Sequence, residues 1–172
     1  MLLKKIRYCN FRPFIGQQEI DFIADSSEND ANVTVILGEN TFGKSTFVLS
    51  FIWCLYGESR FDRPNDILNK KVEEQMSFGQ QERAWVEIEF EDDGLSYRIK
   101  RSQLFTMGKN GKLVSNETEA VLTYVTANGE TVTLGKYQNE FNDAIRSILP
   151  KDLASLFFFE GEKDKAIAKN EL

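Results

Sequence analysis

An octet at residues 38–45 constrains this chain more than any other feature. It reads Gly-Glu-Asn-Thr-Phe-Gly-Lys-Ser and fits the phosphate-binding template G-x-x-x-x-G-K-[ST]. The apolar, β-branched run Asn32–Leu37 precedes it and predicts a buried strand, and a helical run follows from Lys44 to Tyr56. Because strand, loop and helix stand in the order that the template requires, the octet predicts a P-loop that binds a nucleotide.

Each residue type in this loop has a physical task. Gly38 and Gly43 permit backbone angles that turn consecutive N–H groups inward, which creates an anion site at a helix N-terminus. Lys44 adds a positive charge that can reach the β- and γ-phosphates, and the Ser45 hydroxyl suits Mg²⁺. Thr46 is expected to donate to the α-phosphate. The loop therefore predicts a nucleoside triphosphate and Mg²⁺ as cofactors.

Composition limits the other possibilities. The 172 residues suit one domain or one lobe of a larger domain, and the net charge of −6 argues against a basic face that grips nucleic acid unaided. Histidine is absent, which excludes histidine-based acid–base or metal chemistry. Cys9 and Cys54 are expected to be core residues outside any disulfide or metal site. The longest apolar stretch, Phe47 to Tyr56, is too short to span a bilayer, so a cytoplasmic protein is expected.

Two strands are predicted before the P-loop and one helix after it. Alternating residues indicate strands at Leu2–Phe11 and Gln17–Phe22, joined by a turn at 12–16. The helix from Lys44 to Tyr56 is apolar around its whole circumference, so it is expected to be enclosed on most sides. Gly57 is expected to cap its C-terminus.

Two turn dipeptides predict β-hairpins. Pairing across Asp93-Gly94 places apolar residues opposite each other on one face and opposite charges on the other. The predicted pairs are Phe90 with Tyr97, Ile88 with Ile99, Glu89 with Arg98, and Glu87 with Lys100. At Asn128-Gly129 a second hairpin is predicted, with Val125 opposite Val132. The polar, glycine-containing residues 108–112 predict a solvated hairpin tip.

The C-terminal third changes character twice. Apolar residues at helical spacing predict a helix from Lys136 to Leu149, ended by Pro150. The apolar run Leu153–Phe159 predicts a buried strand. Residues 163–172 form a charged helix-former segment with too little apolar surface to pack, which is typical of a longer helix leaving the globule. The predicted division is a lobe at 1–162 followed by the start of an outgoing, coiled-coil helix at 163–172.

These elements together resemble one family. Two strands before the P-loop, an asparagine within it, an antiparallel region after it, and an apolar run ending in Glu160-Gly161-Glu162 are similar to the ATPase head of the SMC-like, ABC-type DNA repair proteins. Within that family, the run from Phe157 to Lys163 resembles the DndD ATPases, which are linked to DNA phosphorothioation. The resemblance implies an α/β P-loop NTPase fold, with a mixed sheet around the P-loop helix and an antiparallel β subdomain, and it makes ATP the expected nucleotide.

The resemblance also implies residue roles. Asn40 would contact the γ-phosphate, Thr41, Phe42 and the residues up to Thr46 would wrap the phosphates, and Arg12 would reach the nucleotide. Glu160 would hold the position where many relatives have a glutamine that ligates Mg²⁺, so the metal ligands would be Ser45 and Glu160. On the residues alone, Arg12 could equally be a solvated charge, and Glu160 could simply sit favourably at a helix N-terminus. Thr41 departs from the family's usual glycine.

Two motifs of such heads are missing from the sequence. No apolar strand ends in Asp-Glu, and no Ser-Gly-Gly signature is present. The chain is therefore expected to be an N-terminal lobe whose Lys44 takes part in catalysis, while the general base comes from elsewhere. In the complete ATPase, two heads would close over ATP, each with its C-terminal lobe, and hydrolysis would reopen them to move DNA or a nuclease partner.

Two other functions fit the P-loop. A small P-loop kinase would suit the length, but two strands precede the loop and the middle of the chain lacks an arginine-rich lid. A non-hydrolysing, nucleotide-gated interaction module would bind ATP and dimerise without turnover.

Overall fold

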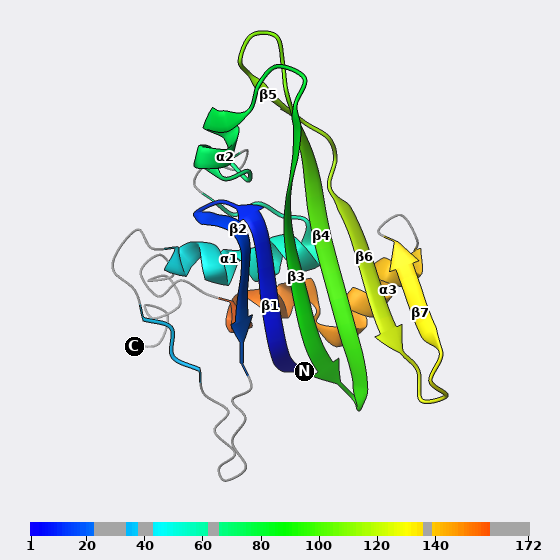
Figure 1. The fold of residues 1–172 in the computed structure, drawn as a ribbon. Helices are drawn as coiled ribbons and strands as arrows, with labels where there is room; N and C mark the ends of the chain where they lie inside the picture. The colour runs from blue at the N-terminus through cyan, green and yellow to red at the C-terminus, as the bar shows by residue number, and fades with distance from the viewer. Residues whose placement is uncertain (23–33, 38–42, 62–65, 136–138, 159–172) are drawn as a thin grey trace.

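The computed structural model describes residues 1–22, 34–37, 43–61, 66–135 and 139–158 (Figure 1). Within these ranges the chain forms strands and helices in the order β1 (Leu2–Phe11), β2 (Phe14–Asp21), α1 (Lys44–Tyr56), α2 (Lys70–Gln75), β3 (Gln81–Asp92), β4 (Leu95–Met107), β5 (Leu113–Ser115), β6 (Glu119–Val125), β7 (Thr131–Gly135), α3 (Asn139–Ile148) and α4 (Lys151–Phe157).

One twisted sheet organises the molecule. Its strands follow the order β2-β1-β3-β4-β6-β7, with β5 paired to β4, and every pairing among the described residues is antiparallel. Neighbouring strands are consecutive in the chain except for two pairs, β1 with β3 and β4 with β6. The segment that carries α1 and α2 connects β2 to β3, so the P-loop helix lies, along the chain, between the first two strands and the remaining strands.

The first predicted hairpin is confirmed. β3 and β4 pair with Phe90 opposite Tyr97 and Glu89 opposite Arg98, and the other two predicted pairs also hold. Asp93 and Gly94 have φ angles of 47° and 77°, which is the left-handed conformation that a tight two-residue hairpin turn requires.

The predicted register of the second hairpin is wrong by one residue. Val125 lies opposite Thr131, and Tyr124 lies opposite Val132. The connection is longer than an Asn-Gly turn, because the Thr126 N–H donates to the Glu130 carbonyl and the Gly129 N–H donates to the Thr126 carbonyl. The residues 108–112 lie between β4 and β5, as predicted for a hairpin tip.

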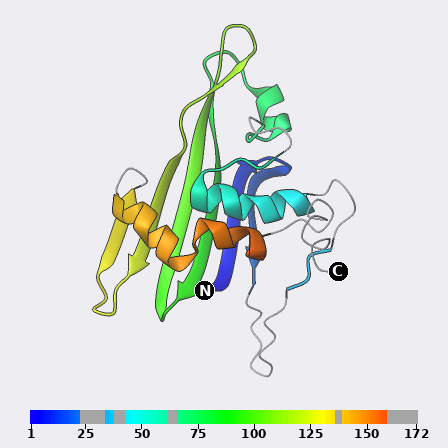
Figure 2. The same ribbon diagram turned by 180° about the vertical axis from the view of Figure 1, so that it is seen from behind.

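Three helices cover one face of the sheet. Figure 2 shows α1, α3 and α4 lying across the strands on the same side. The sheet residues beneath them are almost fully buried: Ile6, Tyr8, Ala84, Val86, Ile88, Phe90, Ile99 and Leu122. Two contacts join α1 to the ends of the other helices. The Tyr56 hydroxyl donates to the carbonyl of Leu149, which follows α3, at 2.7 Å, and Phe51 stacks on Phe158, which follows α4, with ring centroids 4.8 Å apart.

The opposite face of the sheet carries charges. Arg7 pairs with Glu19, Glu87 and Glu89, at N–O distances between 2.6 and 2.8 Å. Glu89 also pairs with Arg98, which is the cross-strand charge pair that the sequence predicts. The other predicted charge pair shares a register position, but Glu87 binds Arg7 while Lys100 lies 3.9 Å from the ring centroid of Trp85.

The P-loop helix agrees with its prediction at both ends. α1 runs from Lys44 to Tyr56 and is capped by Gly57, whose φ is 75° and whose N–H donates to the Trp53 carbonyl. Its buried side chains face all directions, so α1 is enclosed as expected. Cys54 is fully buried, whereas Cys9 is partly exposed on the sheet, so the core prediction holds for Cys54 alone.

The start of β2 differs from its prediction. β2 begins at Phe14, because the turn needs only Arg12 and Pro13. α3 begins at Asn139 within the described residues, with Phe141 and Ile145 buried as the predicted stripe requires.

The predicted strand at Leu153–Phe159 is wrong. Its described part belongs to α4, in which Leu153 is 46% exposed and Ala154 is buried. Pro150 precedes the helix with a φ of −57°, and Asp152 lies in the first turn, where a negative charge is favourable. A run of seven residues, six of them apolar, is too short for periodicity to separate a helix from a strand.

The predicted strand at Asn32–Leu37 is also wrong where it is described. Residues 34–37 have no regular secondary structure, and Val35 and Leu37 are 72% and 89% exposed. A strand needs a neighbour for its backbone hydrogen bonds, and no described strand pairs with this segment.

Candidate functional site

Gly43, the last glycine of the P-loop template, lies where the backbone angle and the neighbouring side chains both disfavour any larger residue. Its φ of 92° is a conformation that side chains rarely adopt, and it is the N-cap of α1 without any side-chain cap. A β-carbon at this residue would lie 2.9 Å from Cγ of Pro13 and 3.4 Å from Cζ of Phe14. The end of the P-loop therefore packs closely against the turn between β1 and β2.

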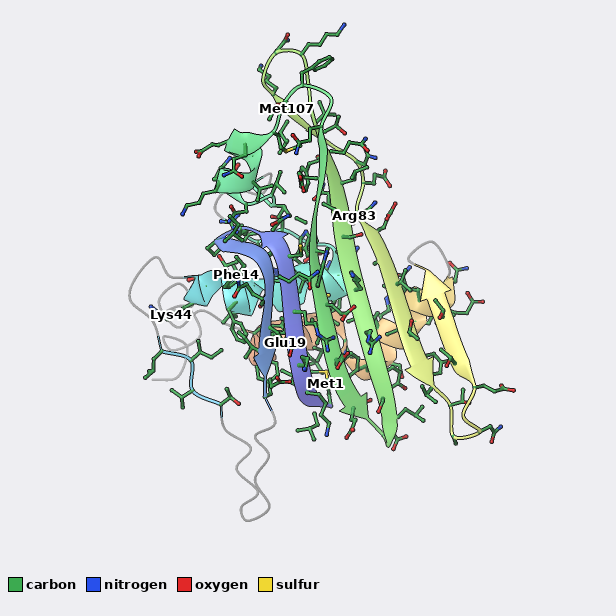
Figure 3. The ribbon with its side chains drawn as sticks, in the orientation of Figure 1. Met1, Phe14, Glu19, Lys44, Arg83 and Met107 are labelled. Carbon is green, nitrogen blue, oxygen red and sulfur yellow. The ribbon has the colours of Figure 1, made fainter. Side chains whose placement is uncertain are left out.

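The first residues of α1 face outward where a phosphate would bind. Lys44 and Ser45 are exposed, whereas Thr46 is 8% exposed. The first intrahelical hydrogen bond runs from the Phe47 N–H to the Gly43 carbonyl, so the preceding N–H groups belong to the end of the helix that favours negative charge. Figure 3 places Lys44 at the N-terminal end of α1.

A buried contact holds the middle of α1 on the sheet. The hydroxyls of Tyr8 and Ser50 are 2.9 Å apart, and Ser50 donates to the Phe47 carbonyl, so Tyr8 is the donor of the pair. Burial raises the pKa of Tyr8, which keeps its proton in place. The Tyr8 ring also stacks on Phe14 at 4.4 Å, which fixes the aromatic side chain that lies against Gly43.

Arg12 has structural partners. Its Nη1 donates to the Asp66 carbonyl at 2.8 Å, and its guanidinium lies 4.2 Å from the ring centroid of Phe61. Its backbone N–H donates to the Ile67 carbonyl. The side chain is thus directed toward the segment before α2, and its predicted contact with the nucleotide stays a prediction.

A hollow of about 510 Å³ opens beside Arg12. It is lined by Arg12, Pro13, Ile15, Asp66, Leu68, Asn69, Lys70 and Lys71. Pro13 therefore separates this hollow from Gly43. Asn69 organises its wall, because its side chain accepts from the N–H groups of Lys71 and Val72 and donates to the Arg12 carbonyl.

Sequence reasoning missed this supporting layer. Asn69 stands before the helix-forming Lys70–Gln75, and an asparagine in that place is a recognisable N-cap signal. By contrast, no pattern connects Pro13, Phe14 and Tyr8 with Gly43, because these residues are distant in the chain and meet only in the folded structure.

Five predicted site residues lie outside the described part of the chain. They are Gly38, Asn40, Thr41, Phe42 and Glu160. Among the described residues there is no group of three or more histidine, cysteine or acidic side chains that could hold a metal ion. No helix within the described ranges has the length and apolar character needed to cross a lipid bilayer.

Comparison with known protein families adds the decisive observation. Residues 5–172 match the AAA domain family AAA_23. The chain belongs to this AAA family. The match includes the P-loop, α1 and all the described strands apart from the first residues of β1, and it confirms the expected α/β P-loop NTPase fold class. The mixed sheet that the resemblance implies around the P-loop helix is not seen, because the described strands pair only antiparallel.

Two further comparisons place this AAA domain among known proteins. It is 29% identical over 174 residues to the DNA double-strand break repair Rad50 ATPase of Thermoplasma volcanium, and the match covers 99% of this chain. The chain spans 16% of the length of that relative. A solved structure from work on ATP-driven dimerization and DNA-stimulated activation of SMC ATPases has a TM-score of 0.44 and 17% identity, with 98% of each chain covered.

Proposed function

We propose that this AAA domain is the ATP-binding N-terminal lobe of an SMC-like, ABC-type ATPase that acts on DNA in the cytoplasm. ATP binding would bring two heads together, and hydrolysis in the complete protein would separate them. The observation that carries the proposal is the P-loop sequence joined to its geometry: Gly43 at positive φ, followed by exposed Lys44 and Ser45 at the start of α1.

The residues present fit Mg²⁺-bound ATP. A β-carbon at Gly43 would fill space next to the turn, so the loop needs glycine there to keep its shape at the helix N-terminus. Lys44 would pair with the β- and γ-phosphates and stabilise charge during phosphoryl transfer, and Ser45 with Glu160 would hold the metal. The metal, when bound, would neutralise charge on the phosphate oxygens. Arg12, Asn40, Thr41, Phe42 and Thr46 would complete the phosphate and nucleotide contacts.

The exposed segment 34–37 supports a second lobe. Its apolar side chains stand immediately before the P-loop and are exposed instead of paired in the sheet. We infer that a strand from a C-terminal lobe pairs with this segment, which would bury Val35 and Leu37 and steady the P-loop. The general base and the signature motif would come from that lobe and from the second head.

The DNA target is a finer proposal. Among SMC-like ATPases, the run Phe157–Lys163 favours the DndD type, which is linked to DNA phosphorothioation. A DndD-type protein would act with other DNA modification or nuclease proteins. Phe158 supports a defined role for this run, since it stacks on Phe51 of the P-loop helix and so ties the residues before Glu160 to α1.

Calorimetry with MgATP tests the nucleotide site directly. Replacing Lys44 by alanine should weaken ATP binding at least 100-fold, on the order of 3 kcal/mol, because the loop loses its charged phosphate ligand. Lys112→Ala is the matched control, since that lysine lies at the hairpin tip and should leave binding unchanged. Equal ATP affinity in the wild type and the Lys44→Ala variant would overturn the proposal.

Product analysis separates the proposed ATPase from the kinase. Incubation with ATP and nucleoside monophosphates should yield no nucleoside diphosphate from the acceptor. Phosphorylated acceptor would instead favour a P-loop kinase. ATP-dependent dimerisation of the complete protein without any phosphate release would favour the non-hydrolysing module.

A further inference from the structure

Arg101 is a buried arginine at the far end of the P-loop helix. It lies on the helix-covered face of β4 and is 4% exposed. Its Nε donates to the Cys54 carbonyl at 2.9 Å, its Nη2 donates to the Leu55 carbonyl at 3.2 Å, and its Nη1 donates to Thr118 at 3.1 Å. One guanidinium therefore binds two consecutive carbonyls in the last turn of α1.

Its charge is balanced by the helix. Among the described residues Arg101 forms no salt bridge, and burial lowers its pKa. The carbonyls that it binds form the negative end of the α1 dipole, and no basic residue lies in the last turn of α1 itself. Arg101 from the sheet thus supplies the positive charge that the C-terminus of this helix lacks.

The capping glycine makes room for this contact. A β-carbon on Gly57 would lie 3.0 Å from Nη1 and 3.2 Å from Cζ of Arg101. Gly57 also has a φ of 75°. The guanidinium therefore packs directly against Gly57, and a shift of the helix end would disturb both this packing and the two hydrogen bonds to the carbonyls.

This contact provides directional information that apolar packing lacks. Apart from Ser50, which accepts from Tyr8, the buried side chains in the middle and last turns of α1 are apolar, and apolar contacts have no preferred direction, so they define the rotation and axial position of a helix weakly. Hydrogen bonds have preferred distances and angles. The planar guanidinium, with two donors on adjacent carbonyls, sets both the position and the rotation of the last turn.

We propose that Arg101 is a positioning residue that fixes the P-loop helix on the sheet and thereby sets where Lys44 and Ser45 stand. The helix is 13 residues long, which corresponds to roughly 20 Å, so a tilt of about 3° at its C-terminus moves its N-terminus by about 1 Å. A displacement of that size is enough to misalign phosphate ligands. This inference rests on the proposed function, since it assigns Arg101 to the same nucleotide site.

The test compares ATP affinity in folded variants of the full-length protein. Arg101→Met removes the charge and every donor while keeping an unbranched side chain, and it should raise the Kd for MgATP at least tenfold. Arg101→Lys keeps the charge but replaces the planar guanidinium and its several donors by a single ammonium, so it should raise the Kd for MgATP about threefold. Each Kd is measured at least 15 °C below the unfolding midpoint of that variant, where loss of stability alone would leave the Kd unchanged.

Phe90→Leu is the matched control. Phe90 is buried on the same sheet face but stacks on Tyr97 at the far end of β3, so this variant should lower the unfolding temperature and leave the Kd within twofold of the wild type. Kd values within twofold of the wild type for every folded Arg101 variant would overturn the proposal. If Arg101→Met does not fold, Arg101→Lys alone decides.

Hydrogen exchange tests the same contact without nucleotide. The Gly57 amide donates to the Trp53 carbonyl in the last turn of α1, and its exchange should become at least tenfold faster in the Arg101 variants and stay unchanged in Phe90→Leu. Unchanged exchange in folded Arg101 variants would refute the positioning role. If the wild type binds no ATP, the proposed function fails, while this measurement still reports on Arg101.

Discussion

Gly43 shows how one residue joins the P-loop to the sheet. It combines a left-handed backbone with a close approach of Pro13, whose Cγ would lie 2.9 Å from an added β-carbon. A residue with a side chain would be strained by the positive φ and would also clash with Pro13, so glycine is needed for both reasons.

Gly43→Ala should therefore impair both stability and ATP binding. The unfavourable backbone angle costs about 1–3 kcal/mol, and the clash with Pro13 must move the start of α1 away from the turn. We expect a lower unfolding midpoint in urea and a Kd for MgATP raised at least tenfold. Gly94→Ala is the control, because Gly94 also has positive φ but nothing lies within 4 Å of its β-carbon position. If the two variants bind ATP equally well, the close approach at Gly43 has no functional role.

At this scale the sequence predicts the ligands and misses their support. The template identifies Gly43, Lys44 and Ser45, since the role that we propose for each in phosphate binding depends on local spacing. The contact with Pro13 and the buried hydroxyl pair of Tyr8 and Ser50 depend on how β1 packs on α1. No local pattern encodes such packing.

α1 is the element on which the site depends, and it contributes two acidic protons, one on the buried Cys54 and one on the partly buried Tyr56. Burial raises the pKa of Cys54 to about 12 from 9.0, and burial raises that of Tyr56 to about 12 from 10.0. Both groups stay protonated in the folded state over a range in which the unfolded chain loses their protons. Their contribution to stability is therefore complete below pH 9 and is lost as the pH rises from 9 toward 12.

Cys54→Ala should make this alkaline loss less steep. Between pH 9.5 and 11 the free energy of unfolding of the wild type should fall more steeply than that of the variant, by up to about 1.4 kcal/mol per pH unit. Urea unfolding at several pH values measures both slopes, and each protein at pH 7 provides its own baseline. Parallel slopes would mean that the Cys54 thiol titrates alike in both states.

Among the elements, long patterns are predicted better than short ones. The 13 residues of α1 and the β3–β4 hairpin carry many concordant signals, so their ends and register agree with the structure. α4 follows Pro150 and is only seven residues long, so its apolar residues read equally well as a strand. The Val125 register fails because the hairpin turn closes through Thr126 and Glu130.

For the whole molecule, the exposed segment before the P-loop makes a separate prediction. Val35→Asp combined with Leu37→Asp should change the unfolding free energy of residues 1–172 by less than about 0.5 kcal/mol, because both side chains are exposed. In a complete ATPase that contains the proposed second lobe, the same pair should lower the unfolding midpoint and ATP affinity, because charges would be buried against that lobe.

Val114→Asp is the matched control for this pair. Val114 is 58% exposed near the hairpin tip, away from the P-loop, and its change should be neutral in both contexts. Differential scanning fluorimetry with and without MgATP measures both quantities. If the Val35 and Leu37 changes leave the unfolding midpoint and the ATP affinity of the complete protein unchanged, this segment is not buried there.

The same segment shows why the sequence misleads at this scale. Thr34, Val35, Ile36 and Leu37 have strand-forming character, but a strand also needs a neighbour, and the described sheet offers none to them. Periodicity describes which faces residues present, and it does not tell whether the pairing strand belongs to the same lobe. The fold class was predictable because it depends on the P-loop and on the sheet, whose described strands all lie between residues 2 and 135.

The order of the strands has a consequence for the speed of folding. β1 and β3 are neighbours, yet about 70 residues separate them, including the P-loop and α1. Closing so long a loop is entropically slow, and the contacts that reward it form only when α1 docks on both strands. The rate-limiting barrier to folding should therefore include the ordering of the P-loop helix. A nascent chain would then form its central sheet and dock the P-loop helix in a single cooperative step.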